Sequence, residues 1–292
     1  MYDITVLCRP HKHHVHLTEL PYTEQPPPVL GVTTLNNNIF VVYDKLPFIV
    51  VYMSQQPYTR LPNISINRLK RPHDIVAGSI CLYVSDPPSN AIWRVRAADS
   101  KEDPILWVSG VKAVSVSVTS EEKLVLLVVF DVQGSVAERN ATYRGEIQIY
   151  GRGAVKETVI KLSTDITAPL CVVMTTRKTF IVSYGFQWHE MNRVCEVDMT
   201  GRMVKAFGST TGYGVGQLNT PYNVSLDDDE RIIVADTCNH RVLLLNEQLM
   251  LQRVLVSDVH PRCPRRLHYE SHSGRLLVGL TNGHVDIYQL RA

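Results

Sequence analysis

The sequence lacks the short motifs that identify most metal, redox and nucleotide sites. Its six cysteines stand at positions 8, 81, 171, 195, 238 and 263 and form no CxxC pair, so neither a zinc knuckle nor a thioredoxin-like redox pair is indicated. The glycine-rich stretch "FGSTTGYGVGQLNTP" contains neither GxxxxGK(S/T) nor a GxGxxG that opens a helix. We therefore expect free thiols, no bound nucleotide, no cofactor and no dedicated metal site.

Long apolar runs and an excess of one charge are also missing. The longest apolar run, from Leu124 to Phe130, is too short to cross a bilayer. The first residues, "MYDITVLCRPHKHHVHL", lack the basic start, apolar stretch and cleavage site of a secretory leader. The 30 basic and 28 acidic residues give a net charge of +2, so any basic surface has to be a local patch. We expect a soluble, cytoplasmic, monomeric protein that does not bind membranes.

Short runs of β-branched and aromatic residues recur along the chain, whereas runs with helical spacing are rare. Six such runs end at Asp44, Asp86, Asp131, Tyr184, Asp236 and Leu280, at intervals of 42, 45, 53, 52 and 44 residues. A second apolar run follows each of them, and a proline often introduces a strand upstream, as in "RPHDIVA" and "TPYNVSL". A period of about 40 to 50 residues with four strands per unit predicts an all-β fold, a six-bladed β-propeller with four-stranded antiparallel blades.

The predicted ring needs an N-terminal strand to close it. We expect a single domain, 1–292, with blades at about 26–67, 68–110, 111–166, 167–217 and 218–261, and a last blade made of 262–292 plus 1–25. The last unit ends after its third strand, "HVDIYQL", and so lacks an outer strand. The strand-like stretches "DITVLC" and "HHVHLTEL" are candidates to pair with it and cover its edge.

One unit, "GYGVGQLNTPYNVSLDDDERIIVADTCNHRVLLLNEQ", resembles an NHL repeat, with its glycine-rich lead-in, its Pro before the inner strand and its VAD and NHR segments. The second unit keeps the Pro and Ser85-Asp86 but has Ser89-Asn90-Ala91 where Asn239-His240-Arg241 would fall. The resemblance implies a six-bladed propeller like the C-terminal module of tripartite-motif (TRIM) proteins, where it recruits RNA or protein partners. The RING, B-box and coiled coil of those proteins are not found in this sequence, so we do not expect ubiquitin ligase activity from it.

The segment "ADTCNHRV" raises a chemical alternative, because Cys238 and His240 are two residues apart and a Cys–His pair can activate a thiolate. Yet the corresponding ends of the first two units carry an aspartate with no cysteine or histidine beside it. Short polar side chains at such corners commonly bond the turn backbone. We therefore expect a structural repeat motif made of Asp44, Asp86, Asp236, Asn239, His240 and Arg241.

The densest group of metal-ligand residue types is His11, His13, His14 and His16. In a strand, two of these side chains face one way and two the other, so at most two converge. We expect a solvated edge strand there rather than a metal site.

An enzyme with an ion on the axis of the propeller is the alternative function. The starts of the predicted inner strands offer Asp74, Asn223, His73 and His268, and other units offer Thr33, Ser115 and Cys171. A calcium cage needs more oxygen ligands than these, and a zinc site needs three converging histidines. A metal-dependent hydrolase or lyase therefore stays the second hypothesis.

The favoured function is recognition without catalysis. The segments that lead into the inner strands are locally basic and include a tyrosine, a combination that suits phosphates and exposed bases. Acidic residues such as Glu102, Asp103 and Asp258 lie in neighbouring connections. The long hairpins 131–145 and 184–192, with Trp188 and His189, are further candidate contacts. The predicted binding residues, for a protein, a peptide or single-stranded RNA on one face of the ring, are Arg60, Arg68, Lys70, Arg71, His73, Lys112, Tyr222, Arg262, Arg265 and Arg266.

Overall fold

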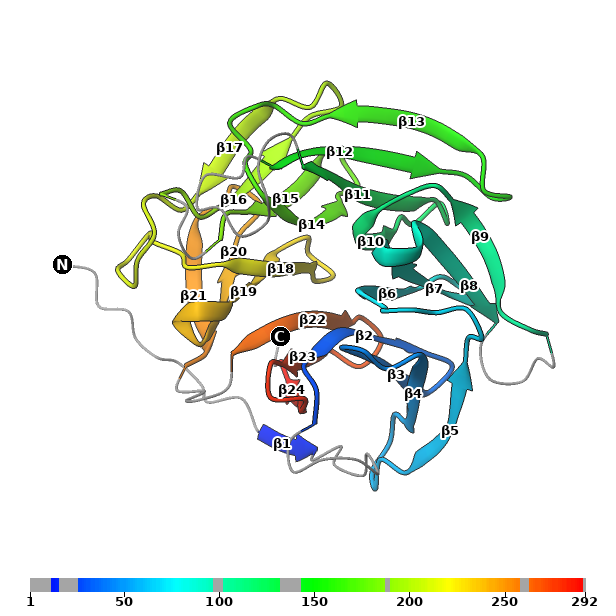
Figure 1. The fold of residues 1–292 in the computed structure, drawn as a ribbon. Coiled ribbons are helices and arrows are strands. Elements are labelled where there is room, and N and C mark those ends of the chain that lie inside the picture. The colour runs from blue at the N-terminus through cyan, green and yellow to red at the C-terminus, as the bar shows by residue number, and fades with distance from the viewer. Residues whose placement is uncertain are drawn as a thin grey trace.

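The chain forms a ring of six four-stranded antiparallel sheets, each sheet being one blade (Figure 1). The structure is a computed structural model that describes residues 12–15, 26–96, 102–131, 143–186, 190–257 and 263–290. This architecture confirms the predicted all-β propeller. The hairpin tips at 132–142 and 187–189, with Trp188 and His189, lie outside the described residues, as do His11 and His16.

The first three blades follow one another along the chain from the N-terminal side. Blade one contains β2 (Val29–Leu35), β3 (Asn38–Tyr43), β4 (Phe48–Met53) and β5 (Arg60–Ser65). Blade two contains β6 (Asp74–Ala77), β7 (Cys81–Asp86), β8 (Ala91–Arg96) and β9 (Ile105–Ser109), with the short helix η1 (Pro87–Ser89) between β7 and β8. Blade three contains β10 (Ala113–Val118), β11 (Leu124–Asp131), β12 (Tyr143–Tyr150) and β13 (Lys156–Lys161).

The last three blades complete the ring. Blade four contains β14 (Pro169–Met174), β15 (Phe180–Tyr184), β16 (Arg193–Val197) and β17 (Met203–Phe207). Blade five contains β18 (Pro221–Leu226), β19 (Ile232–Asp236), β20 (Arg241–Leu245) and β21 (Leu251–Val256), with η2 (Thr237–Asn239) between β19 and β20. Blade six contains β22 (Pro264–Glu270), β23 (Arg275–Leu280), β24 (Val285–Gln289) and β1 (Lys12–Val15).

The N-terminal strand supplies the outer edge of the last blade, as the sequence predicts. β1 runs antiparallel to β24, with His13 opposite Ile287 and Val15 opposite Val285. Figure 1 shows β1 outside β24, while the inner strands β2, β6, β10, β14, β18 and β22 surround the axis. The first and last parts of the chain therefore share one sheet, which closes the ring.

Burial follows from the stacking of blades. Every position of β15 and β19 is buried, because neighbouring blades cover both faces of these second strands. The outer strand β17 instead alternates between half-buried and exposed positions, since one of its faces meets solvent. Apolar clusters join adjacent blades; one packs Phe40 of blade one against Leu82 of blade two. Within the described ranges, no helix has the length and apolar composition needed to span a membrane.

Candidate functional site

The segments that connect one blade to the next enter the inner strands at one end of the ring, which we call the crossing face. The hairpins between second and third strands, including η1 and η2, lie at the same end because successive strands run antiparallel. The opposite end, where first strands turn into second strands, is the turn face. At the crossing face, the residues predicted from the sequence divide into an inner, bonded group and an outer, exposed group.

Arg266 is the centre of the inner group and is 1% exposed. It lies within the inner strand β22 rather than in a connecting segment. Its guanidinium donates to the carbonyl oxygens of Leu30 and His73, the latter at 2.7 Å. Its Nε also lies 4.0 Å from Oδ1 of Asp74. Arg266 therefore links blade six to blades one and two, while its Nη1 is buried without a hydrogen-bond partner.

Tyr222 and Arg265 form the second part of the inner group. Arg265 donates from Nη2 to the Tyr222 hydroxyl at 2.8 Å, and its guanidinium carbon lies 4.4 Å from the centre of the ring. The guanidinium carbon of Arg266 lies 4.9 Å from the same centre. Burial lowers the pKa of Arg265. The tyrosine ring that the sequence offers as a stacking platform is thus already in contact with two cations.

The outer group consists of exposed cations on the segments that lead into blades two and three: Arg68, Lys70, Arg71 and Lys112. Arg71 donates from Nε to Asp44 Oδ1 at 2.7 Å, and this bond raises the pKa of Arg71. Arg60 lies apart from the others, because it begins β5 at the turn face and donates to Asn63. Arg262 lies outside the described residues.

Asp236 and Asp86 occupy equivalent corners and hold equivalent backbone groups. Asp236 accepts the backbone N–H of Asn219 at 2.7 Å, and Asp86 accepts those of Lys70 and Arg71 at 2.9 and 3.1 Å. Each carboxylate thus fastens the crossing segment that leads into its own blade. Asp44 differs, because its carboxylate forms an ion pair with the Arg71 side chain of the following blade.

The rest of the repeat motif fastens the glycine-rich crossing segment. Asn239 donates to the carbonyl oxygen of Gly212 at 2.8 Å and to Asp236 Oδ2, also at 2.8 Å. Arg241 donates from Nε to Asp236 Oδ2 at 2.7 Å and from Nη2 to the carbonyl oxygen of Gln217 at 2.8 Å. These bonds show what the carboxylate, the amide and the guanidinium do together at this corner of blade five.

His240 contacts the next blade as well as its own corner. Its φ of 53° places it in the left-handed region at the end of η2. Its Nδ1 lies 3.3 Å from Sγ of Cys263, where blade six begins, and burial raises the pKa of the Cys263 thiol. A raised thiol pKa disfavours the thiolate that nucleophilic chemistry requires.

The polar side chains of the inner strands bond neighbouring blades to each other. Asp74 Oδ2 accepts the N–H of Val116 at 3.0 Å, and Asn223 Oδ1 accepts the N–H of Leu267 at 2.9 Å. Two more backbone N–H groups donate to a neighbouring blade, that of Ala77 to Thr33 Oγ1 and that of Val172 to Ser115 Oγ. The Asn223 amide also donates to Cys171 Sγ. The described residues contain no group of three or more His, Cys, Asp or Glu side chains placed to hold a metal ion.

Two histidines near the axis, His73 directly before β6 and His268 in β22, have lowered pKa values that favour the neutral form. Burial, followed by the Arg266 guanidinium, lowers the pKa of His73 to about 3, and burial lowers that of His268 to about 4. A histidine in an unfolded chain has a pKa of about 6.5. Below pH 6.5 the folded state therefore binds fewer protons than the unfolded state. The two neutral histidines contribute their full stability above pH 6.5, and this contribution is lost as the pH falls toward 4.

We expect the free energy of unfolding in urea to decrease from pH 7 to pH 4.5, by up to about 1.4 kcal/mol per pH unit for each histidine. The variant His268→Gln can keep the 2.8 Å contact with Thr34 Oγ1 and should flatten the curve. His272→Gln is the matched control, because its imidazole is 69% exposed. A pH profile that His268→Gln leaves unchanged would contradict the assignment.

Two residues at the crossing face escape the sequence analysis. Lys45 is exposed at the β3–β4 hairpin, and its position directly after Asp44 is the signal that could have placed it there. Trp93 is 7% exposed in β8, and its indole Nε1 has no hydrogen-bond partner. Nothing in the sequence distinguishes this tryptophan from an ordinary core residue.

Comparison with known proteins gives one sequence match and several structural ones. The NHL repeat family matches residues 218–243, which include β18, β19 and η2. No curated protein matches the sequence significantly. A catalytically inactive virginiamycin B lyase from Staphylococcus aureus, with quinupristin, has a TM-score of 0.64 at 8% identity, covering 96% of this chain and 98% of the lyase.

Two further solved structures share the fold. The WD40 β-propeller domain of Doa1 has a TM-score of 0.60 at 13% identity, over 92% of this chain and 95% of that one. A luciferin-regenerating enzyme has a TM-score of 0.64 at 11% identity, over 91% of this chain and 92% of that one. Identities this low show a common fold alone. Together, the matched repeat and the ring of six blades support an NHL-type six-bladed β-propeller.

Proposed function

We propose that this chain is a non-catalytic recognition scaffold that binds an acidic protein partner on its crossing face. The observation that carries the proposal is a set of exposed cations on blades one to three, which we call the cation arc. None of them has an ion pair with any described residue. The cation arc consists of Lys45, Arg68, Lys70 and Lys112.

A protein partner suits this face better than single-stranded RNA. Sequence-independent RNA binding combines free cations with an aromatic ring on which a base can stack. Here the Tyr222 ring is in contact with Arg265 and Arg266, and its hydroxyl is bonded to Arg265. The cation arc without a free ring supports electrostatic attraction to an acidic surface.

The alternative of an axial hydrolase or lyase has less support. The side chains that the sequence offers for the axis, including Asp74, Asn223 and Ser115, bond one blade to another. Side chains held in this way keep the ring together and are not free to bind a substrate. The lyase among the structural neighbours shares the fold at 8% identity, so its activity does not transfer to this chain.

The proposal is tested by reversing charge at two members of the cation arc. Proteins captured by the immobilised chain after nuclease treatment are identified, and the purified partner is titrated by calorimetry. We expect Lys45→Glu with Lys112→Glu to weaken binding at least about tenfold, and salt to weaken the native complex, because the attraction is electrostatic.

Arg152→Glu with Lys156→Glu is the matched control, since both residues are exposed at the β12–β13 hairpin of the turn face and the change in net charge is the same. Equal affinities for the arc variant and the native chain would contradict the proposal. Capture that disappears with nuclease would instead favour the RNA alternative.

A further inference from the structure

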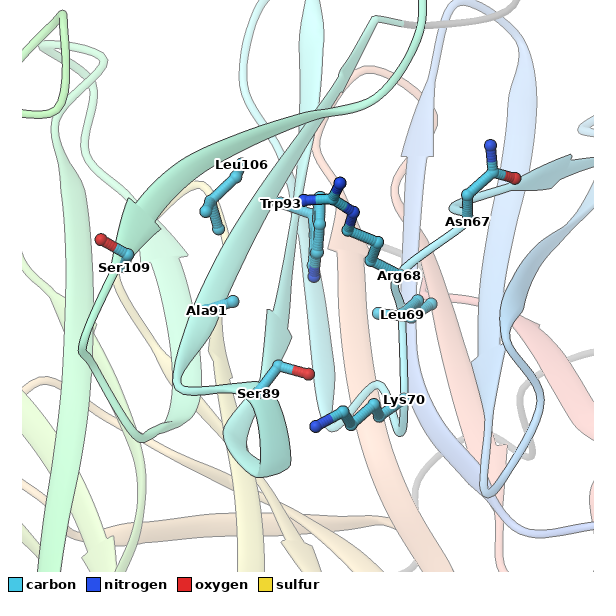
Figure 2. A pocket seen from close by; sticks show the side chains of 9 residues that line it. All are labelled: Asn67, Arg68, Leu69, Lys70, Ser89, Ala91, Trp93, Leu106 and Ser109. Atoms are coloured by element: carbon cyan, nitrogen blue, oxygen red, sulfur yellow. The ribbon is translucent and has the colours of Figure 1, made fainter.

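A pocket of about 510 Å³ opens beside the crossing segment of blade two. One wall is that segment, and the other is formed by η1 with the strands β8 and β9 (Figure 2). Figure 2 shows the Arg68 and Lys70 side chains reaching from the segment toward the strand that carries Trp93 and the turn that carries Ser89. The lining residues are Asn67, Arg68, Leu69, Lys70, Ser89, Ala91, Trp93, Leu106 and Ser109.

Two polar atoms of this pocket are buried without a partner. The indole Nε1 of Trp93 and the hydroxyl of Ser89 make no hydrogen bond, and Trp93 as a whole is only 7% exposed. A buried donor left without an acceptor is unfavourable, and such groups are uncommon in native proteins. In Figure 2 the indole nitrogen, the Ser89 hydroxyl and the Lys70 ammonium follow one another down the pocket. A ligand with a hydrogen-bond acceptor between Trp93 and Ser89 would provide the partner that both the indole N–H and the hydroxyl lack.

The charge of the lining is of one sign. Arg68 and Lys70 are exposed, have no ion pair with a described residue, and share the pocket with no acidic side chain. Their cationic ends and the two neutral donors together suit a carboxylate, which accepts several hydrogen bonds at once. Leu69, Ala91 and Leu106 add an apolar part to the same pocket.

We propose that this pocket binds an acidic peptide segment in which an aspartate or glutamate stands next to a large apolar residue. The carboxylate lies between Arg68 and Lys70 and accepts the N–H of Trp93, and the apolar neighbour packs on Leu106. This inference rests on the proposed function and names the partner chemistry that the crossing face selects. It extends that function, because Trp93, Ser89 and Leu106 are not members of the cation arc.

The pocket suits a peptide better than a nucleotide. A base needs an exposed aromatic face for stacking, but the Trp93 ring belongs to the apolar cluster between blades one and two. What the indole offers to the pocket is a single N–H donor. Directional donors beside an apolar surface are typical of pockets that anchor one side chain of a peptide.

The test is selection from a library of random 12-residue peptides displayed on phage, with the full chain as bait. We expect the selected peptides to share Asp or Glu beside Leu, Ile, Met or Phe. Synthetic copies are then measured by fluorescence anisotropy. Arg68→Glu with Lys70→Glu should lower the affinity for these peptides at least about tenfold, because two cations near the peptide carboxylate become two anions.

Trp93→Phe separates recognition from folding. The phenylalanine keeps an aromatic ring in the cluster but removes the N–H, so peptide affinity should fall about fivefold while Tm decreases by only a few degrees, since most of the buried ring is retained. Arg152→Glu with Lys156→Glu is again the matched control and should leave peptide affinity unchanged.

Selected peptides without the acidic residue, or equal binding to the native chain and the pocket variants, would overturn the inference. If Lys45→Glu with Lys112→Glu abolishes binding of the protein partner while the pocket variants do not, the inference fails and the proposed function stands. If Lys45→Glu with Lys112→Glu leaves the affinity for the protein partner unchanged, the proposed function fails, whatever the pocket variants do to the selected peptides.

Discussion

Replacing Arg266 with alanine is expected to lower the free energy of unfolding by about 3 to 5 kcal/mol, one of the two largest effects we predict. The guanidinium is buried and donates to the carbonyl oxygens of Leu30 and His73, so its loss leaves acceptors of two other blades without a donor. Asp74, 4.0 Å away, loses its nearest cation at the same time. Urea unfolding followed by tryptophan fluorescence measures the change.

The neighbouring Arg265 is the matched control for this prediction. It stacks on Tyr222 and bonds to its hydroxyl, but it is only partly buried. Arg265→Ala should therefore cost about 1 kcal/mol, the ordinary value for one hydrogen bond with a cation–π contact. Equal losses for the two alanine variants would contradict the role that we assign to Arg266.

Deleting residues 1–20 should lower Tm by about 10 °C or more, because several kcal/mol are lost with an outer strand and each kcal/mol is worth a few degrees in a chain of this size. The deletion removes β1 and leaves β24 as a free edge, with Val285 and Ile287 at unpaired backbone positions. An exposed edge also promotes association between chains. Scanning calorimetry and light scattering measure the two consequences.

A synthetic peptide of residues 8–20 provides the control for the deletion. Added to the shortened chain, it should pair with β24 and restore part of the lost Tm, because the ladder depends on backbone pairing rather than on a covalent connection. An unchanged Tm after the deletion would show that β1 contributes nothing to ring closure.

The fold could be predicted from local patterns. Prolines at the start of inner strands, as at Pro221 and Pro264, and apolar runs that end in Asp86 and Asp236 repeat often enough to reveal six units. The missing outer strand of the last unit indicated the N-terminal closure, and β1 confirms it. The strands are predictable because each depends on residues close together in the chain, and the closure is predictable because the repeat leaves one blade with an uncovered edge.

The site was less predictable because it depends on burial and on contacts between distant segments. Arg68 and Arg266 look alike in the sequence, yet Arg68 is exposed and Arg266 is fully enclosed where three blades meet. The pocket joins residues 67–70 with residues up to Ser109, and no short motif marks that meeting. The unpartnered indole of Trp93 becomes visible only once its surroundings are known.

One measurement tests the central claim, that partners bind on the crossing face, most directly. A photo-crosslinking amino acid replaces Lys112 on the crossing face in one variant and Lys178, an exposed residue in the β14–β15 turn of the turn face, in another. Both variants are irradiated with the purified partner. We predict a crosslinked protein from position 112 and none from position 178. A crosslink from position 178 alone would contradict the account.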